Sequence, residues 1–344
     1  MQYKLLGRSG LRVSEVALGT MTFGTEWGWG ASKEESRRIF TAFADAGGNF
    51  IDTANRYTEG SSERFVGEFI HGDRHRFVVA TKYGLFTRRD VPNFSGNHRK
   101  NMVRALEESL ARLGTDYVDL LWVHAWDFTT AVDEVMRALD DVVRAGKVLH
   151  VGASDTPAWV VAQANTLAAL RGWSPFVALQ LRYSLIDRSA EADLLPMARA
   201  FSLAVTPWSV LGAGVLSGKY NRSARAEGRA KEGAATVERN LKIAATVVAV
   251  AEELGCTPAP VALAWARQQP GLVPILGARD LEQFRDNLGT LEVRLAEEHL
   301  RRLDEVSRMD LGFPHNFLSQ PRIVDLLHGG MQDRIDLSEK KSAE

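Results

Sequence analysis

Residues 77–124 of the chain read FVVATKYGLFTRRDVPNFSGNHRKNMVRALEESLARLGTDYVDLLWVH, with two short apolar runs separated by a segment of helical period. The runs at 77–81 and 118–123 are rich in valine or leucine, which is typical of buried strands. The segment between them carries one helical stripe and a glycine stop signal: Met102, Leu106, Ser109, Leu110, Leu113 and Gly114. This order of strand, helix and strand predicts two parallel strands joined by a crossover helix.

The same alternation continues in both directions from this unit. Strand-length apolar runs occur at residues 16–19, 50–52, 77–81, 118–123, 148–153, 177–181, 204–208 and 273–276. Eight evenly spaced strands without a linker predict an α/β fold, a (β/α)8 TIM barrel of about 250 core residues. We expect one domain over residues 1–330 and a polar, flexible tail over 331–344. The polar stretch 221–236 predicts a long surface loop, such as a lid.

Other signals predict elements around the barrel. Residues 3–14 alternate on both sides of a turn, which predicts an N-terminal β-hairpin across the N-terminal mouth of the barrel. Extra C-terminal helices are expected at 258–269 and 296–307. Ser32 is expected to cap the first helix, with Glu35 as the second half of a capping box.

The composition excludes several classes of function. Lys and Arg number 42 and Asp and Glu number 43, so no basic excess favours nucleic acid. Cys256 is the only cysteine, which excludes an internal disulfide and a site with several thiolate ligands. The polar N-terminus lacks the apolar core of a secretory signal, and the apolar stretch 243–251 is shorter than the ~20 residues that span a bilayer. We expect a cytoplasmic protein without membrane insertion, with a small-molecule partner, as a monomer or an oligomer.

Four side chains that could do chemistry are predicted to meet at one rim of the barrel. Asp52 ends the second strand, and Lys82 and His124 directly follow the third and fourth, which are its neighbours in a barrel. Tyr57 follows Asp52 by five residues, so its hydroxyl can reach the same mouth. Each residue alone has an ordinary structural interpretation, as a helix cap, a strand-end lysine, a core imidazole or a loop tyrosine. Their joint position favours an active site.

This combination suits the reduction of a carbonyl group. Hydride attack on the carbon must be matched by a proton delivered to the oxygen, and a phenol can supply it. A free phenol has a pKa of about 10, so Tyr57 needs a nearby cation, for which Lys82 is placed. Asp52 would hold the lysine, and His124 would hydrogen-bond the carbonyl and orient it.

At these residues the chain resembles the aldo-keto reductase superfamily, in particular its bacterial, potassium-channel β-subunit-like branch. The resemblance runs in order through 50–57 (FIDTANRY), 79–84 (VATKYG), 112–119 (RLGTDYVD) with 123–124 (VH), and 152–154 (GAS). It implies a catalytic tetrad of Asp52, Tyr57, Lys82 and His124. It also implies NAD(P)H-dependent interconversion of aldehydes or ketones with alcohols, without a metal.

Cofactor binding is expected without a Rossmann site, because no Gly-x-Gly-x-x-Gly follows an early strand. The resemblance implies cofactor-binding residues at strand ends and in the following loops: Gly19, Thr20, Met21, Asp52, Ser154, Asp155, Gln180, Trp208, Ser209, Leu211, Lys219, Gly277, Arg279, Gln283 and Asn287. Trp208 would stack on the nicotinamide, while Ser154 and Gln180 would orient its carboxamide. Asp155 departs from the Asn or Arg often found there, since a carboxylate accepts amide protons but donates none.

The phosphate end of the cofactor is expected where 276–287 (LGARDLEQFRDN) runs from the eighth strand into a helix N-terminus, which favours anions. Arg279 could clamp a 2′-phosphate, with Gln283 and Asn287 on the same helix face. We therefore expect NADPH as cofactor, NADH being less favoured, and reduction as the direction.

Aromatic residues near the predicted mouth indicate a wall that selects the carbonyl substrate. They are Trp27, Trp29, Tyr83 and Trp126. An apolar or ring-bearing substrate would suit them.

Two other functions remain open at this point. A Schiff-base aldolase also places a reactive lysine at a strand end, although Asp52 beside Lys82 would keep the amine protonated. Some members of the superfamily are cofactor-binding regulatory or redox-sensing subunits with little turnover, and an intact tetrad does not exclude that role.

Overall fold

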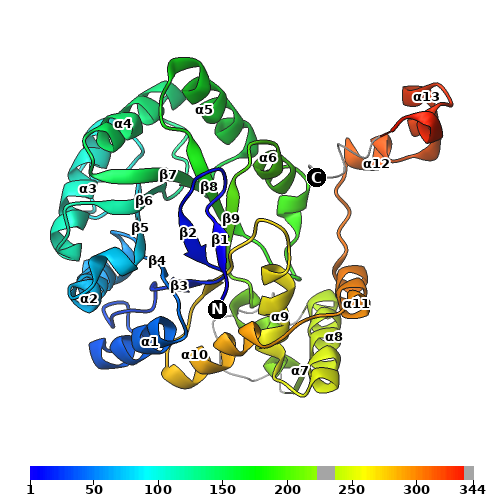
Figure 1. Cartoon of the computed structure of the whole chain (residues 1–344), viewed down its shortest axis with the longest axis horizontal. Helices are drawn as coiled ribbons and strands as arrows, with labels where there is room; N and C mark the ends of the chain where they lie inside the picture. The colour runs from blue at the N-terminus through cyan, green and yellow to red at the C-terminus, as the bar shows by residue number, and fades with distance from the viewer. Residues whose placement is uncertain (223–236, 337–344) are drawn as a thin grey trace.

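The computed structural model of the protein describes residues 1–222 and 237–336. Its main sheet has eight parallel strands in the order β10-β3-β4-β5-β6-β7-β8-β9 (Figure 1). The strands are β3 Ala17–Gly19, β4 Phe50–Asp52, β5 Val78–Tyr83, β6 Val118–Val123, β7 Val148–Ser154, β8 Phe176–Arg182, β9 Ala204–Trp208 and β10 Ile275–Leu276. All eight predicted strands are present, with ends that differ from the prediction by two residues at most.

The two edges of the sheet meet through the residues just before β10. The Val205 N–H donates to the Gly271 carbonyl at 2.9 Å, and the Val273 N–H donates to the Val205 carbonyl at 2.8 Å. These bonds join β9 to the β10 end, so the eight strands form a nearly closed barrel. The prediction of a (β/α)8 TIM barrel is confirmed.

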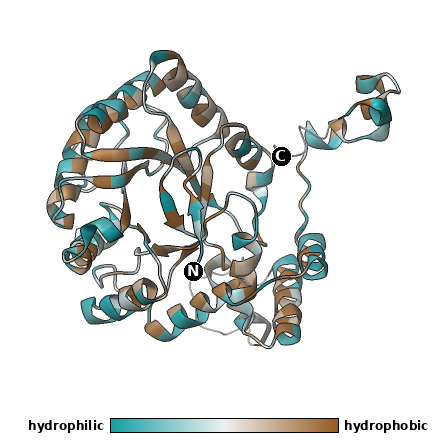
Figure 2. Cartoon of the chain, in the orientation of Figure 1, coloured by the Kyte–Doolittle hydropathy of each residue, from teal (hydrophilic) through white to brown (hydrophobic). Residues whose placement is uncertain are grey.

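Helices cover the outside of the barrel (Figure 1). The helices are α1 Lys33–Asp45, α2 Ser61–Ile70, α3 Arg99–Leu113, α4 Val132–Arg144, α5 Ala158–Arg171, α6 Leu194–Ala200, α7 Lys219–Arg222, α8 Glu238–Leu254, α9 Pro258–Arg267, α10 Leu281–Leu288, α11 Glu297–Ser307, α12 His315–Leu318 and α13 Pro321–His328. Figure 2 shows hydrophobic residues concentrated on the strands and hydrophilic residues on the outward helix surfaces. In α3 the predicted stripe is buried, and Gly114 ends the helix with a φ of 62°. This pattern is that of an amphipathic helix packed on a sheet.

The inside of the barrel is filled by alternate residues of the strands. Ala80, Trp122 and Ala178 belong to this interior cluster, and the indole of Trp122 is fully buried. Gly152 lies beside Trp122 on the neighbouring strand. A Cβ at this glycine would lie 2.5 Å from two ring carbons of Trp122, so the missing side chain makes room for the indole.

We expect Gly152→Ala to destabilise the fold by about 1–3 kcal/mol, because the added methyl group overpacks the interior against Trp122. Urea unfolding monitored by tryptophan fluorescence measures the change. Gly72→Ala is the matched control, since a Cβ there meets no heavy atom within 4 Å. Equal stability of the two variants would contradict this account of the interior.

The predicted hairpin closes the N-terminal mouth of the barrel. Strands β1 Tyr3–Leu5 and β2 Arg12–Ser14 pair in antiparallel register. Leu6 and Val13 are fully buried and belong to the same interior cluster as the barrel residues. The hairpin therefore extends the core of the barrel at its N-terminal end.

The start of α1 confirms one half of the expected capping box and corrects the other. The Ser32 side chain accepts the Glu35 N–H at 3.2 Å, so Ser32 is the N-cap. The Glu35 carboxylate does not return to Ser32, and it accepts instead from the Leu281 N–H at 2.6 Å. The reason is tertiary, because the start of α10 presents an unpaired backbone N–H next to α1.

The C-terminal part of the chain adds helices to the barrel, and the last of them are not buried. The extra helices predicted at 258–269 and 296–307 are present as α9 and α11. Helices α12 and α13 project from the barrel, and none of their residues is buried (Figure 1). Positions 223–236 of the expected loop and 337–344 of the expected tail lie outside the described residues.

None of the described helices is by itself long and apolar enough to cross a membrane. Helices α8 and α9 reach that length and composition only together, and they meet at a bend of 99°. Most of α9 is buried in the core of the protein.

Candidate active site

The carboxyl ends of β4, β5 and β6 bring three of the predicted side chains to one mouth of the barrel. Asp52 ends β4, Lys82 is the penultimate residue of β5, and His124 directly follows β6. Parallel pairing sets Asp52 beside Ala80 and Lys82 beside Trp122. Because side chains alternate along a strand, Lys82 faces the barrel interior on the same side as Ala80.

The ammonium group of Lys82 is held by three oxygen atoms. Its Nζ lies 2.5 Å from Asp52 Oδ2, 2.9 Å from the Thr53 carbonyl oxygen and 3.0 Å from the Tyr57 hydroxyl. The side chains of Lys82 and Asp52 are almost fully buried. The other Asp52 oxygen accepts from Gln180 Nε2 at 2.9 Å. An ammonium has three donors, so all its bonding capacity is used and its position is defined.

The segment after β4 aims the Tyr57 hydroxyl at this ammonium. The Asn55 N–H donates to the Lys82 carbonyl at 3.2 Å, and Tyr57 begins the 3-10 helix η1 Tyr57–Gly60. Thr58 has a φ of 46°, and its hydroxyl donates to the Phe23 carbonyl at 2.5 Å. A non-glycine residue in this region costs on the order of 1–3 kcal/mol, so its neighbours must hold it there. The loop is consequently constrained to one shape.

The fourth side chain, His124, completes the group. Its ring meets the Tyr57 ring edge to face, with 5.8 Å between centroids. Its Nδ1 is buried and has no hydrogen-bond partner in the part of the chain that the structure describes. The structure therefore brings together all four residues that the sequence singled out.

The mouth holds these groups in defined protonation states. Burial raises the pKa of Tyr57 above its usual value, and this outweighs the lowering by Lys82. Burial lowers the pKa of Lys82, but Asp52 and Tyr57 together raise it above its usual value. Burial, and then the Lys82 charge, hold the pKa of His124 well below 6.5. At neutral pH the site thus contains a protonated phenol, an ammonium and a neutral imidazole.

This charge pattern weakens the Schiff-base interpretation. An imine-forming amine must lose its proton near neutral pH. Asp52 and Tyr57 raise the pKa of Lys82 despite its burial, which keeps the amine protonated.

The sequence model of the aldo/keto reductase family matches residues 15–308, which span the barrel from just before β3 to just after α11. The chain belongs to the aldo/keto reductase family.

Several curated proteins are similar in sequence to this chain over most of their length. A norsolorinic acid reductase of Emericella nidulans is 40% identical over 321 residues, covering 90% of this chain and 82% of the relative. A norsolorinic acid reductase of Aspergillus flavus is 38% identical over 327 residues, covering 91% and 83%. An aryl-alcohol dehydrogenase (NADP+) of Phanerodontia chrysosporium is 38% identical over 346 residues, covering 93% and 89%.

Family membership and these relatives establish the chain as an oxidoreductase enzyme. The three relatives are fungal proteins. They give no support to the bacterial, channel-subunit-like branch that the sequence segments suggested.

In this aldo/keto reductase, the residues predicted for the nicotinamide end lie on neighbouring strands of the same mouth. Ser154 and Gln180 are buried and pair in register on β7 and β8. Asp155 follows β7 with a φ of 42°, and its Oδ1 accepts from Trp208 Nε1 at 3.1 Å. The carboxylate therefore fixes the indole of Trp208. The sequence interpretation, which assigned Asp155 to an amide of the cofactor, missed this contact.

Other predicted cofactor residues differ in the exposure of their side chains. Thr20 is fully buried, and its hydroxyl donates to the Asp52 carbonyl at 3.0 Å, so that side chain is part of the scaffold. Gly19 and Met21, on either side of it, are partly exposed. Partly exposed positions also include Ser209, Leu211 and Lys219 in the stretch after β9.

The predicted phosphate end lies at the start of α10. Arg279, Gly277 and Gln283 are exposed there, while Asn287 is buried and donates to the Gly277 carbonyl at 3.2 Å. The backbone N–H groups of this helix start are less open to an anion than the sequence suggested. Asp280 accepts the Gln283 N–H at 2.8 Å, in addition to the Glu35 contact with the first N–H of α10. Recognition of a phosphate here would rest on side chains.

The four predicted substrate-wall residues separate into two groups. Trp27 and Trp29 lie in the loop after β3 with 5.7 Å between ring centroids, and Trp126 lies in the loop after β6. All three are partly exposed. Tyr83 is buried, packs in the cluster between the barrel and its helices, and donates to the Asn97 carbonyl at 3.2 Å. It does not line the mouth, because it follows Lys82 on the strand and faces the opposite side.

One charged residue of the mouth was absent from the sequence prediction. Arg182 is the last residue of β8, two positions beyond Gln180 and on the same side of the strand. Its Nε pairs with Asp187 Oδ2 at 2.7 Å, and its guanidinium lies 5.9 Å from the Trp208 ring centroid. The alternation that places Gln180 in the mouth would have identified Arg182 as well.

The depressed pKa of His124 predicts a stability effect at acidic pH. Below pH 6.5 the unfolded chain binds a proton at this residue while the folded protein does not. The free energy of unfolding therefore falls, by up to ~1.4 kcal/mol per pH unit from this group. We expect His124→Gln to lose less stability than the wild type between about pH 7 and pH 5 in urea unfolding. His328→Gln on the exposed helix α13 is the control, and parallel curves for wild type and His124→Gln would refute the assignment.

Proposed function

We propose that this enzyme reduces an aryl aldehyde or aryl ketone to an alcohol with NADPH, and that Tyr57 is the general acid. Lys82 and Asp52 would set the charge around the phenol, and His124 would orient the carbonyl. The observation that carries the proposal is the short chain of contacts from Asp52 through Lys82 Nζ to the Tyr57 hydroxyl, at 2.5 and 3.0 Å.

The roles follow from the protonation states in the mouth. The cofactor would supply the hydride. Tyr57 is protonated and can give its proton to the developing alkoxide, while the Lys82 ammonium stabilises the phenolate that remains. The neutral His124 ring has one N–H, which can donate to the same carbonyl oxygen. Because Asp52 holds the ammonium in place, little rearrangement is needed as the proton moves.

The nicotinamide end of the cofactor is assigned to the side chains around Trp208. The indole ring is held by Asp155, and Ser154 and Gln180 lie on the adjacent strand ends. A fixed aromatic ring beside amide and hydroxyl groups fits a flat ring that carries a carboxamide.

The preference for NADPH rests on two observations. Arg279 is exposed at the start of α10 and can reach a 2′-phosphate. The relative from Phanerodontia chrysosporium is named for NADP+. Asp280 and Glu35 occupy backbone N–H groups of the same helix start, so Arg279 would have to supply most of the discrimination.

The substrate class is supported by the relatives and by the rim of the mouth. Relatives with 38–40% identity are named for norsolorinic acid and aryl alcohols. Trp27, Trp29 and Trp126 offer partly exposed aromatic surface in the loops beside the tetrad. Such a rim favours a flat, apolar substrate.

The test is NADPH oxidation, followed by absorbance, with matched aryl and alkyl aldehydes and ketones, and with NADH in parallel. We expect turnover with NADPH, and higher kcat/KM for the aryl members of each pair. Tight NADPH binding without turnover of any substrate would instead favour a cofactor-binding regulatory protein. Equal rates with NADH and NADPH would contradict the assignment of Arg279 to the 2′-phosphate.

We expect Asp155→Ala to raise KM for NADPH about 5- to 10-fold, since the Trp208 indole loses the hydrogen bond that positions it. Asp155→Asn is the matched variant, because its amide oxygen can accept the same bond and asparagine tolerates a positive φ. Initial-rate kinetics measure both. If Asp155→Asn is as impaired as Asp155→Ala, the charge of Asp155 matters more than its bond to Trp208.

A further inference from the structure

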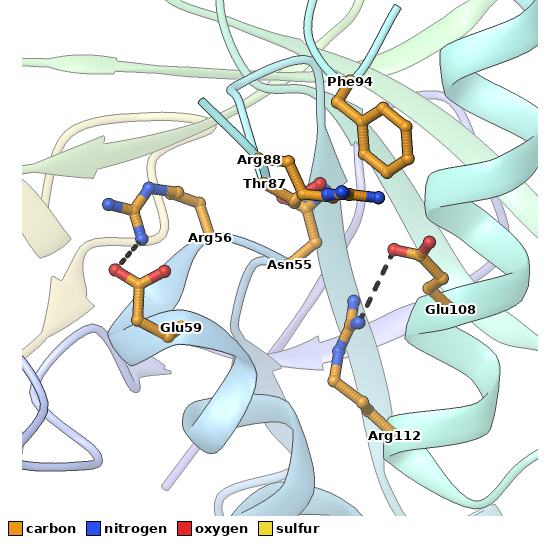
Figure 3. Close-up of a pocket in the computed structure, with 8 residues that line it drawn as sticks. All are labelled: Asn55, Arg56, Glu59, Thr87, Arg88, Phe94, Glu108 and Arg112. Carbon is orange, nitrogen blue, oxygen red and sulfur yellow. Dashed lines mark hydrogen bonds and ion pairs between the residues drawn. The ribbon is translucent and has the colours of Figure 1, made fainter. Parts of the chain in front are cut away.

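A cavity lies outside the tetrad, where α3 meets the segments that follow β4 and β5 (Figure 3). Its volume is about 180 Å³. The residues that line it are mostly polar or charged: Asn55, Arg56, Glu59, Thr87, Arg88, Phe94, Glu108 and Arg112.

Asn55 is the first sign that this cavity accepts a ligand. The residue is only 3% exposed, and neither Oδ1 nor Nδ2 of its side chain has a hydrogen-bond partner among the described residues. A buried polar group left in this state costs on the order of 1–3 kcal/mol, so native proteins rarely retain one without a use. The Asn55 amide lines a cavity large enough to hold a molecule that would satisfy it.

The charges around the cavity favour an anion. Both lining carboxylates are already paired, Glu59 with Arg56, and Glu108 with Arg104 and, at 3.9 Å, with Arg112. Arg112 donates to Glu63 at 2.6 Å.

The remaining lining cation is Arg88. Its guanidinium lies 4.9 Å from the Phe94 ring centroid, and it has no carboxylate partner in the part of the chain that the structure describes. Figure 3 shows the side chains of Arg88, Arg112 and Asn55 gathered in one region, with Arg112 joined to Glu108 by a dashed line. Two guanidinium groups and an amide N–H are donors that suit oxyanions.

We propose that this cavity binds a small metabolite bearing a carboxylate or phosphate group, recognised by Arg88, Arg112 and Asn55. A single water molecule needs roughly 10–15 Å³ of such cavity volume, so there is room for a molecule several times larger than water. This space fits inorganic phosphate or a short dicarboxylate such as succinate. The site is separate from the tetrad and from the predicted cofactor residues, none of which lines it.

Occupation of the cavity would act on the loop that carries Tyr57. Asn55 lies two residues before Tyr57, and its N–H donates to the Lys82 carbonyl. Arg56, between them, pairs with Glu59 on the cavity wall. A bound anion therefore restrains the segment that presents the phenol to Lys82.

The test is a calorimetric titration of the NADP+-saturated protein with inorganic phosphate and, separately, with succinate. Saturating NADP+ keeps the probes away from a cofactor site, and the readout does not depend on turnover. We expect one saturable site per chain for at least one probe. Binding of phosphate alone identifies a phosphate ligand, and binding of succinate alone identifies a carboxylate. Absence of saturable binding for both probes would overturn the proposal.

Two substitutions make the assignment specific to this cavity. Arg88→Gln should weaken binding by about ten-fold or more, because a charge-assisted hydrogen bond is lost. Arg89→Gln removes the adjacent exposed arginine, which stacks on Phe86 and does not line the cavity, and should change binding by less than about two-fold. Asn55→Asp replaces the amide by a carboxylate and should abolish binding. Equal weakening by the two arginine variants, or unchanged binding to Asn55→Asp, would contradict the proposed site.

Discussion

Replacement of Tyr57 by phenylalanine is expected to lower kcat by about 10²–10⁴-fold, the usual contribution of a positioned general acid. The reason is geometric and electrostatic, since the Tyr57 hydroxyl is the protonated group that lies 3.0 Å from the buried Lys82 ammonium. The phenyl ring keeps the edge-to-face contact with His124, so the shape of the mouth is retained. NADPH oxidation with an aryl aldehyde measures the loss.

The control separates catalysis from folding and from cofactor binding. Tyr117→Phe removes another hydroxyl, one that within the described chain bonds to the exposed His75, and should leave kcat unchanged. Binding of NADPH to Tyr57→Phe, followed by quenching of protein fluorescence, should be close to that of the wild type. If Tyr57→Phe retains more than about a tenth of the wild-type kcat, a group other than Tyr57 donates the proton.

Replacement of Lys82 by methionine is expected to remove activity and also to destabilise the fold by about 3–5 kcal/mol. Methionine is close in length and fills the same space, so the effect comes from charge rather than from a cavity. Asp52 would be left as a buried carboxylate that keeps, among the described residues, the side chain of Gln180 as its partner. Urea unfolding measures the stability, and NADPH oxidation measures the activity.

The double variant Lys82→Met with Asp52→Asn decides whether the loss comes from that unpaired carboxylate. Removing both charges should cost clearly less stability than the sum of the two single variants, because no uncompensated charge remains. Activity should stay low in the double variant, since the phenol has lost its cation. Additive losses of stability would mean that Asp52 and Lys82 contribute independently, against the contact at 2.5 Å.

Much of the fold could be predicted from local sequence. The eight strands are apolar runs separated by helical segments, and they are observed with small shifts at their ends. Gly114 and Ser32 act as the stop and start signals that their residue types predict. These features depend on neighbours a few residues away, which is why a single sequence reveals them.

The tetrad could also be predicted, for a topological reason. Asp52, Lys82 and His124 end three consecutive strands of a parallel barrel, and such ends meet at one mouth whatever the details of packing. Tyr57 was harder to place, because its reach depends on the turn through Thr58 with its positive φ. The pattern predicted that these four side chains lie close together, and the structure gives the distances between them.

The sequence by itself thus determined the barrel, the closing hairpin and the meeting of Asp52, Lys82 and His124 at one mouth, whereas it placed Tyr83 on the wrong side of its strand and missed Arg182. Only the tertiary structure decided which hydrogen-bond partners the polar side chains have. Asp155 bonds to Trp208 and Glu35 bonds to the start of α10, although their neighbours in sequence suggested other roles. The Asn55 amide has no partner within residues 1–222 and 237–336, and it lies beside a cavity that three separate segments form. Such contacts join residues far apart in the chain, and no local pattern of residue types encodes them.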